Sequence, residues 1–151
     1  MKTYIGTKVI KAEPMRLMAA ERVLNRKIKD GDSDGYLVTY ADGYSSWSPR
    51  LVFEKAYRHT NGMTFGLAIE VAKLGKKISR TGWNGKGLFV VYQKGYPQGI
   101  PCNKQSAEAW GLHEGDLFKC NPYLQIKQVD GSHSMWVPSI GDVLAEDWQI
   151  I

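Results

Sequence analysis

The chain has 151 residues, 43% of them hydrophobic, and a formal net charge of +5 at pH 7, which suits one folded domain or two small ones. The longest uncharged apolar run, residues 87–93, is far too short to cross a bilayer, and no basic segment followed by an apolar one begins the chain, so we expect a cytoplasmic protein with no membrane partner. Residues 1–60 carry eleven Lys and Arg against seven Asp and Glu, and residues 61–151 carry nine against eight. Binding a nucleic-acid polymer usually needs a wider basic surface than this, so we expect no such partner.

Residues 1–60 predict a small β-rich module with one or two short helices. Alternating Tyr, Ile, Thr and Val residues over 4–10 indicate a strand. Pro14 suits an early helical position, where its missing N–H does no harm, and predicts a helix over residues 14–23. The other expected elements are a hairpin of strands 36–40 and 44–47 around Ala41-Asp42-Gly43, and a helix over 50–57 with Leu51, Val52, Phe53 and Ala56 covering the hairpin.

Residues 61–151 predict a small antiparallel β-sheet decorated by a short helix, so we expect an α+β fold for the chain. Thr64 can cap a helix over residues 65–74 that ends at Gly75 and carries a wide apolar stripe. Clustered Gly and Pro residues indicate a loop-rich stretch over 94–121. The remaining expected elements are strands at 77–80, 87–92, 123–129 and 135–138, a short helix at 104–110, a hairpin turn at 130–133 and a closing strand at 147–151.

The turn at residues 81–85 places a Trp between two glycines, although a tight turn does not need one. Trp83 either plugs the core from its corner or offers a flat face to a ring-shaped ligand. Arg80 and Lys86 flank the turn and are candidates for meeting a phosphate, because an Arg side chain can hold two phosphate oxygens at once.

Aromatic residues are unusually frequent in the second part of the chain. Any one of them is expected in the core, but together they exceed what so small a core needs, so one or two are expected to line a pocket or an interface. They are Phe65, Trp83, Tyr92, Trp110, Tyr123, Trp136 and Trp148.

Catalytic and metal-binding signatures are absent from the sequence. No Gly-x-Ser-x-Gly elbow, Walker loop, HExxH or paired-glycine fingerprint occurs. Asp142, Glu146 and Asp147 could act as acid and base, but such residues more often cap helices or lie on solvated edges. No CxxC or HxxxH pair occurs among the cysteines and the histidines near them, so we expect neither a metal nor a cofactor. These residues are Cys102, His113, Cys120 and His133.

Three motifs, in this order, resemble a phage and prophage family that includes the second type of Thoeris anti-defence protein. They are MTFGLAIE at 63–70, KKISRTGWNGKG at 76–87, and WVPS with DVLAEDW at 136–139 and 142–148. The resemblance covers about three-fifths of the chain, and 95–121 is similar to one branch of the family. Residues 1–60 are instead similar to a small phage module of unknown role, so we expect domains at 1–60 and 61–151.

The resemblance implies a sponge, a protein that binds and sequesters a cyclic nucleotide immune signal without cleaving it. The signal is an isomer of cyclic ADP-ribose made by the infected bacterium, and some members also hold cyclic oligonucleotides at a separate site. Family members of this kind are homotetramers with ligand sites where protomers meet. Because the signal is made by the infected bacterium, the resemblance also implies a location in the cytoplasm of the host cell.

The matching motifs also imply which residues bind the ligand. Phe65 and Trp83 would stack on the base, and Asn84 with the Gly85 backbone would hold ribose or phosphate. Asp142 and Asp147 would accept hydrogen bonds from ribose hydroxyls. The full expected set is Phe65, Arg80, Trp83, Asn84, Gly85, Lys86, Trp136, Asp142 and Asp147, with Trp148 assigned to the core and no catalytic residue.

Two other functions stay open at this point. One is hydrolysis of the same signal, for which Asp142 and Asp147 are the support in the sequence. The other is a structural or interaction protein of the phage, in which the surplus aromatic residues would form oligomer contacts.

Overall fold

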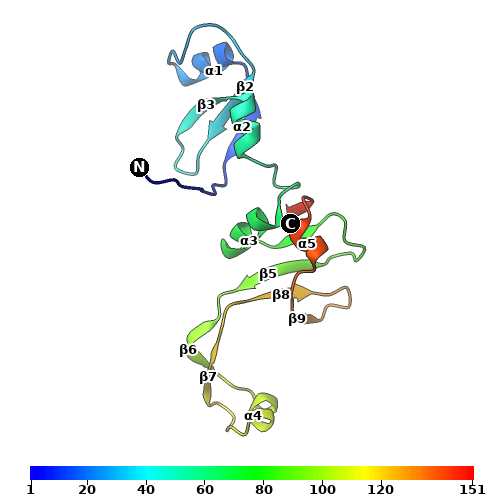
Figure 1. The fold of residues 1–151 in the computed structure, drawn as a ribbon. Helices are drawn as coiled ribbons and strands as arrows, with labels where there is room; N and C mark the ends of the chain where they lie inside the picture. The colour runs from blue at the N-terminus through cyan, green and yellow to red at the C-terminus, as the bar shows by residue number, and fades with distance from the viewer. The chain divides into compact units, whose positions relative to one another are not determined.

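The computed structural model describes residues 1–151, which divide into two compact units, Met1–His59 and Thr60–Ile151 (Figure 1). The chain combines short helices with small antiparallel sheets, so the expected α+β class is confirmed. No helix has the length and apolar character that a membrane span requires.

The first unit is built on a three-stranded antiparallel sheet in the order β1-β2-β3. Gly43 occupies the β2–β3 turn with a φ of 86°, as the predicted hairpin requires. The elements are β1 (Lys11–Pro14), α1 (Leu17–Leu24), β2 (Gly35–Thr39), β3 (Ser45–Pro49) and α2 (Arg50–Ala56).

A single indole forms the centre of this small core. Trp47 packs against Leu17 and Ala20 of α1, and its Nε1 donates a 2.8 Å hydrogen bond to the Met15 carbonyl. A Cβ at position 35 would lie 2.3 Å from the Trp47 ring, so only glycine fits there. The close approach of Gly35 to Trp47 therefore determines how α1 and the hairpin pack together.

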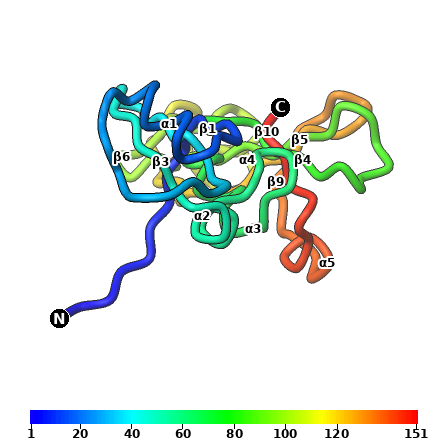
Figure 2. Tube along the Cα trace, turned by 90° about the horizontal axis from the view of Figure 1, so that it is seen from above, coloured from blue at the N-terminus to red at the C-terminus, as the bar shows by residue number.

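The predicted strand over residues 4–10 is wrong. These residues form no regular structure and follow an extended path, visible as the blue segment in Figure 2. The strand lies instead at Lys11–Pro14, where it pairs with β2 from Pro14↔Tyr36 to Lys11↔Thr39. Because β2 ends at Thr39 and the chain then turns, no backbone is left to pair with residues before Lys11.

The predicted role of Pro14 as a helix start is also wrong. Pro14 ends β1, and α1 begins at Leu17. The Met15 and Leu17 amides donate to the carbonyls of Gly35 and Ser33, which keeps the chain extended beyond the proline. An edge strand tolerates proline because its missing N–H need not join a ladder.

Helix α2 lies where predicted but uses a narrower face. Phe53 stacks on Tyr36 at a centroid distance of 4.1 Å and on Tyr57 at 4.9 Å. Leu51, Val52 and Ala56 are exposed, contrary to the expectation that they cover the hairpin. The i, i+4 spacing of Phe53 and Tyr57 already fills the one stripe that faces the sheet.

The second unit contains a five-stranded antiparallel sheet in the order β10-β4-β5-β8-β9. Helix α3 covers one face of it, with Ala68, Val71 and Ala72 packed against the buried side chains of the sheet. The elements are α3 (Phe65–Lys73), β4 (Ile78–Arg80), β5 (Phe89–Gln93), β8 (Tyr123–Lys127), β9 (His133–Met135), α5 (Ile140–Leu144) and β10 (Trp148–Ile150).

Local signals explain the ends of these elements. Thr64 caps α3 by accepting a 3.4 Å hydrogen bond from the Leu67 amide, as predicted. Helix α5 was not predicted, yet Ser139 and Asp142 form a reciprocal capping box at its start. The strand expected at 135–138 is wrong in its bounds, because pairing with β8 begins at His133 and ends at Met135.

Residues 96–120 form an arm instead of the expected loop. Its strands β6 (Tyr96–Pro101) and β7 (Leu117–Cys120) pair with each other, and α4 (Lys104–Trp110) lies between them in sequence, where a helix was predicted. Figure 1 shows the arm leading away from the five-stranded sheet, with α4 at its tip.

Candidate functional site

Four aromatic rings from separate parts of the second unit meet beside α3. Trp148 of β10 is completely buried, as expected, and lies 5.3 Å from Trp83 and 5.5 Å from Phe65 between ring centroids. Trp136 completes the cluster at 5.9 Å from Trp83, edge to face. Phe65, Trp83 and Trp136 are only partly buried, so the cluster joins the core to the surface.

Arg80, at the end of β4, is fixed by two carboxylates from the far end of the chain. Its Nη1 donates to Asp142 Oδ1 at 2.9 Å, and its Nε donates to Asp147 Oδ1 at 2.8 Å. These hydrogen bonds, led by the one that Arg80 donates to Asp147, raise the pKa of Arg80. Nη2 forms no hydrogen bond within the chain and remains available as a donor.

The indole of Trp83 is held by the same oxygen that holds Arg80. Trp83 Nε1 donates to Asp142 Oδ1 at 3.0 Å, so a planar ring and a guanidinium lie side by side. Trp83 therefore packs on the core through its edge contacts and still has exposed surface.

Asp142 has no capacity left for a further donor. Its Oδ1 accepts from Arg80 and Trp83, and its Oδ2 accepts from both the amide and the hydroxyl of Ser139. Burial alone would raise the pKa of Asp142, but the hydrogen bonds from Arg80, Ser139 and Trp83 outweigh burial and lower the pKa to about 2. The carboxylate is thus ionised at neutral pH and acts as a clamp on its neighbours.

Asp147 is more open than Asp142. It accepts from Arg80 through Oδ1 and from the Gly82 amide through Oδ2, at 2.8 Å each. The Arg80 hydrogen bond is the main cause that lowers the pKa of Asp147. Each oxygen keeps one acceptor position, so this half-buried carboxylate can still receive a ligand hydroxyl.

The rest of the turn faces solvent. Asn84 and Lys86 are exposed, and neither side chain forms a hydrogen bond or ion pair in the chain. A Cβ at Gly85 would lie 2.6 Å from Leu88 and 2.7 Å from Val129, which explains the glycine by packing. The turn thus exposes an amide and a cation to solvent a few residues along the chain from Arg80 and Trp83.

Sequence reasoning missed two contributors to this arrangement. Ser139 orients Asp142, and the Gly82 amide orients Asp147. The Ser-x-x-Asp spacing at 139–142 is a recognisable capping box and could have identified the first. The second depends on a contact between residues 65 positions apart and has no local signal.

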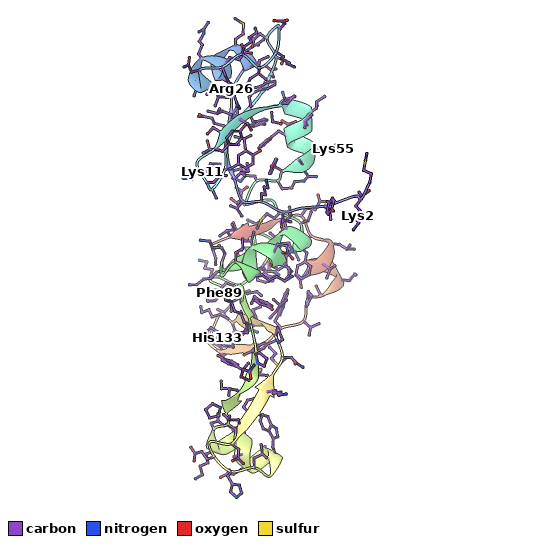
Figure 3. All side chains as sticks on the ribbon, turned by 90° about the vertical axis from the view of Figure 1, so that its left-hand side faces the viewer. Lys2, Lys11, Arg26, Lys55, Phe89 and His133 are labelled. Carbon is purple, nitrogen blue, oxygen red and sulfur yellow. The ribbon has the colours of Figure 1, made fainter.

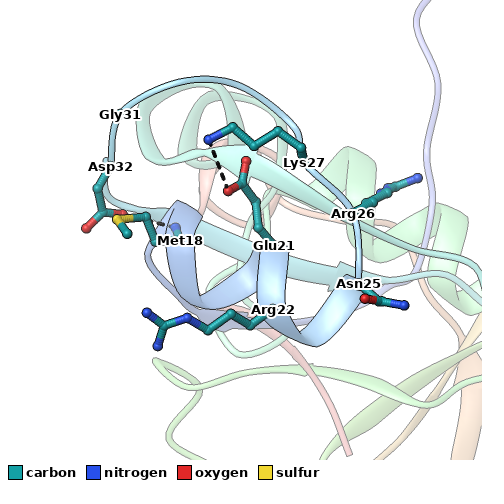
Figure 4. Close-up of a pocket in the computed structure, with 8 residues that line it drawn as sticks. All are labelled: Met18, Glu21, Arg22, Asn25, Arg26, Lys27, Gly31 and Asp32. Carbon is teal, nitrogen blue, oxygen red and sulfur yellow. Dashed lines mark hydrogen bonds and ion pairs between the residues drawn. The ribbon is translucent and has the colours of Figure 1, made fainter.

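Other parts of the molecule offer weaker candidates. A hollow of about 680 Å³ lies between α1 and the loop after it in the first unit (Figure 4). Its carboxylates are already engaged: Glu21 accepts from the Ile28 and Lys29 amides, and Asp32 accepts from Met18 and Arg16. No group of three His, Cys, Asp or Glu residues is placed to hold a metal ion.

Comparison with known proteins finds a family match that spans nearly all of the second unit. A family profile described as Thoeris anti-defense 2-like domain matches residues 63–151. The chain belongs to this family. A curated relative, Thoeris anti-defense 2 of Bacillus phage SP01, is 36% identical over 92 residues, which is 59% of this chain and 94% of the relative. Family membership supports a role in phage anti-defence. The matched region contains Arg80, Trp83, Asp142 and Asp147.

Proposed function

We propose that the second unit binds and sequesters a cyclic nucleotide immune signal, such as an isomer of cyclic ADP-ribose, without cleaving it. The observation that carries the proposal is the shared hydrogen-bond acceptor Asp142 Oδ1, which fixes the Arg80 guanidinium beside the Trp83 ring. A nucleotide presents a flat base next to a charged phosphate and ribose hydroxyls, and this pair of groups meets both kinds of surface.

The proposed contacts follow from which atoms remain free. Trp83 and Phe65 would stack on the base, with Trp136 supporting Trp83. Asn84 and the Gly85 backbone would hold ribose or phosphate. Asp142 would position the site without touching the ligand, because all its acceptor positions are used.

Local charge favours a particular orientation of the ligand. Two carboxylates surround the single positive charge of Arg80, so this corner is net negative and suits ribose hydroxyls, which Asp147 can accept. A phosphate would need the additional positive charge of Lys86, which has no partner in the chain. We therefore place the ribose near Asp147 and the phosphate near Lys86.

The titration of the carboxylates supports sequestration over hydrolysis. A general acid must hold a proton near neutral pH, whereas the pKa of Asp142 is lowered to about 2 and the pKa of Asp147 is also lowered. Both carboxylates also serve as fixed partners of Arg80. Neither has the features of an acid or base poised for catalysis.

A sponge works by stoichiometry, so its affinity must be high. A dissociation constant near 1 nM corresponds to roughly 12 kcal/mol of binding free energy. Half-exposed rings on one chain leave much of a nucleotide in water. We propose that a homotetramer encloses the ligand, with sites where protomers meet.

One experiment separates sequestration from cleavage. A slight excess of protein is mixed with the cyclic ADP-ribose isomer, and the free signal that passes a filter is measured. The protein is then heat-denatured, and the signal in solution is measured again. We expect depletion of free signal and its full recovery, intact, after heating. Loss of the signal would indicate an enzyme, and no depletion would indicate that the ligand is wrong. Tyr44→Ala, in the first unit, is the matched control and should behave as wild type.

A further inference from the structure

The sheet of the first unit carries two neighbouring hydroxyl groups on the face where α1 packs. Thr39 of β2 is paired with Ser45 of β3, and their hydroxyl oxygens lie 3.0 Å apart. Lys11 of β1 is paired with Thr39 from the other side, so the three side chains point to the same face. Figure 3 shows Lys11 on the side of the sheet away from Lys55 of α2.

Arg26 reaches the hydroxyl pair from the loop after α1. Asn25 ends α1 in the left-handed conformation, with a φ of 49°, and this turns the chain toward the hairpin. Arg26 Nη2 then donates to the Ser45 carbonyl and to the Tyr44 hydroxyl, at 3.2 Å each. The guanidinium is therefore anchored through one nitrogen beside Ser45.

The polar atoms left free at this place are hydrogen-bond donors. Nε and Nη1 of Arg26 and Nζ of Lys11 form no hydrogen bond in the chain, and both side chains are exposed. One of the Thr39 and Ser45 hydroxyls donates to the other, so one hydroxyl hydrogen of the pair stays free. The Tyr44 hydroxyl also keeps its hydrogen, because it accepts from Arg26. We call these five residues the cradle.

The carboxylates of the loops around the cradle are already engaged. Glu21 accepts from two backbone amides of the loop after α1. Lys27 lies 3.7 Å from Glu21 and 3.5 Å from Asp30, between nitrogen and oxygen. Asp42 accepts from a backbone amide of its own turn. None of the three forms an ion pair with a cation of the cradle.

One carboxylate shares the face of the cradle. Glu13 is paired with Leu37 in the next row of the sheet, about 7 Å along β1 from Lys11, and its side chain has no partner. Lys29 offsets this charge, because its Nζ lies 5.3 Å from the centroid of the Trp47 ring, and Trp47 is the other neighbour of Leu37 in that row. The two cations of the cradle therefore keep their own positive charge.

We propose that the cradle binds a phosphate dianion, either inorganic phosphate or the terminal group of a small phosphomonoester. Arg26 and Lys11 supply two positive charges, and the free hydroxyls donate to the remaining oxygens. A phosphodiester has one charge and two terminal oxygens, so it matches the cradle less well. A cyclic ADP-ribose isomer has no terminal phosphate, and the cradle lies in the first unit, so this site is separate from the one proposed above.

Isothermal titration of the full chain with base-free probes tests the ligand class. The probes are inorganic phosphate, ribose 5-phosphate and dimethyl phosphate, a diester. We expect dimethyl phosphate to bind at least about tenfold more weakly than the tighter of the two dianions, because one charge and one acceptor oxygen are missing. Tighter binding of ribose 5-phosphate would identify a monoester as the ligand, and tighter binding of inorganic phosphate would identify the free ion. Equal binding of the diester, or no binding of either dianion, would overturn the proposal.

Variants locate the binding in the cradle. Lys11→Gln with Arg26→Gln should weaken binding of the tighter dianion at least about tenfold, since two charge-assisted contacts are lost. Lys2→Gln with Lys55→Gln removes the same charge from exposed positions elsewhere in the first unit and should leave binding unchanged. Equal weakening in the two double variants would show attraction by net charge alone and overturn the proposal.

Two further variants keep the net charge. Thr39→Val with Ser45→Ala removes the hydroxyl pair and should weaken binding about threefold or more. Circular dichroism checks folding, and Ser45→Ala alone replaces this variant if it is not folded. Trp83→Ala, in the second unit, should bind the dianion as wild type does. Loss of binding in Trp83→Ala with binding retained in the cradle variants would contradict the proposal, and the cyclic nucleotide enters none of these measurements.

Discussion

Each unit of this protein is centred on one buried indole, but the surroundings of the two indoles differ. Trp47 donates its N–H to the Met15 carbonyl at 2.8 Å, and Trp148 donates its N–H to the Asp142 carbonyl at 2.9 Å. Trp47 is packed by small and aliphatic residues, whereas Trp148 is surrounded by Phe65, Trp83 and Trp136.

The two units also arrange their other aromatic rings differently. In the first unit Tyr36, Phe53 and Tyr57 stack on one another between the sheet and α2, apart from the core cluster of Trp47. In the second, three further rings gather around the buried one and stay partly exposed, and one of them is clamped by a carboxylate. The ligand site proposed above would account for that arrangement.

The largest expected effect comes from removing the central indole of the second unit. Trp148→Ala should lower the free energy of unfolding by about 3–5 kcal/mol, because the ring is completely buried and supports three others. Urea denaturation followed by circular dichroism measures the change. Trp110→Ala, at an exposed position of the arm, should cost far less, and equal effects would contradict the central role of Trp148.

Loss of the Asp142 charge should have the next largest effect. Asp142→Asn removes the charge that faces Arg80 and weakens the clamp on Trp83, and we expect a loss of about 2–3 kcal/mol in unfolding free energy. Glu146→Gln is the matched control, since this nearby carboxylate is exposed and unbonded; it should change stability by less than about 0.5 kcal/mol.

The same carboxylate predicts a dependence on acid. Because the pKa of Asp142 is lower in the folded chain than its ordinary value of 3.8, its contribution is complete above pH 4 and is lost as the pH falls toward about 2. Thermal melts across this range should show a loss of about 2 kcal/mol from this group. Asp142→Asn should flatten that part of the profile, and a profile identical to wild type would refute the assignment.

The sequence predicted the elements whose signals are local. Thr64 as a cap, Gly43 in its turn and the closing strand at Trp148 all follow from neighbouring residues. The strand expected at 4–10 failed because strand position is decided by the partner, and the hairpin leaves no backbone for it. Strands β6 and β7 were missed because their Gly and Pro residues resemble a loop until the two are paired.

The residues of the candidate site could be named from the sequence, but their contacts could not. Trp83, Asp142 and Asp147 were named from motif resemblance and Arg80 from its place beside the turn. The structure brings all four into one hydrogen-bonded network. Their separate tasks were not predictable, because they depend on which lone pairs are already used. Asp142 and Asp147 are equivalent in the sequence motif and different in their remaining acceptor capacity.

The smallest predicted effect concerns the helix that carries Phe65. Thr64→Ala removes the side-chain acceptor for the Leu67 amide and should cost about 1 kcal/mol. Thr64→Ser keeps the acceptor and should restore most of the loss. Denaturant midpoints compare the two variants, and equal midpoints would show that the cap contributes nothing.

The central claim is that Trp83 is positioned for a ligand as well as packed on the core. Isothermal titration of the cyclic ADP-ribose isomer into wild type and Trp83→Ala, with native mass spectrometry of both proteins, tests it most directly. We predict an affinity loss of roughly tenfold to a hundredfold, consistent with about 1–3 kcal/mol for base stacking, in a variant that stays folded with an unchanged oligomeric state. Unchanged affinity, or disassembly of the variant, would contradict the account and assign Trp83 to the core alone.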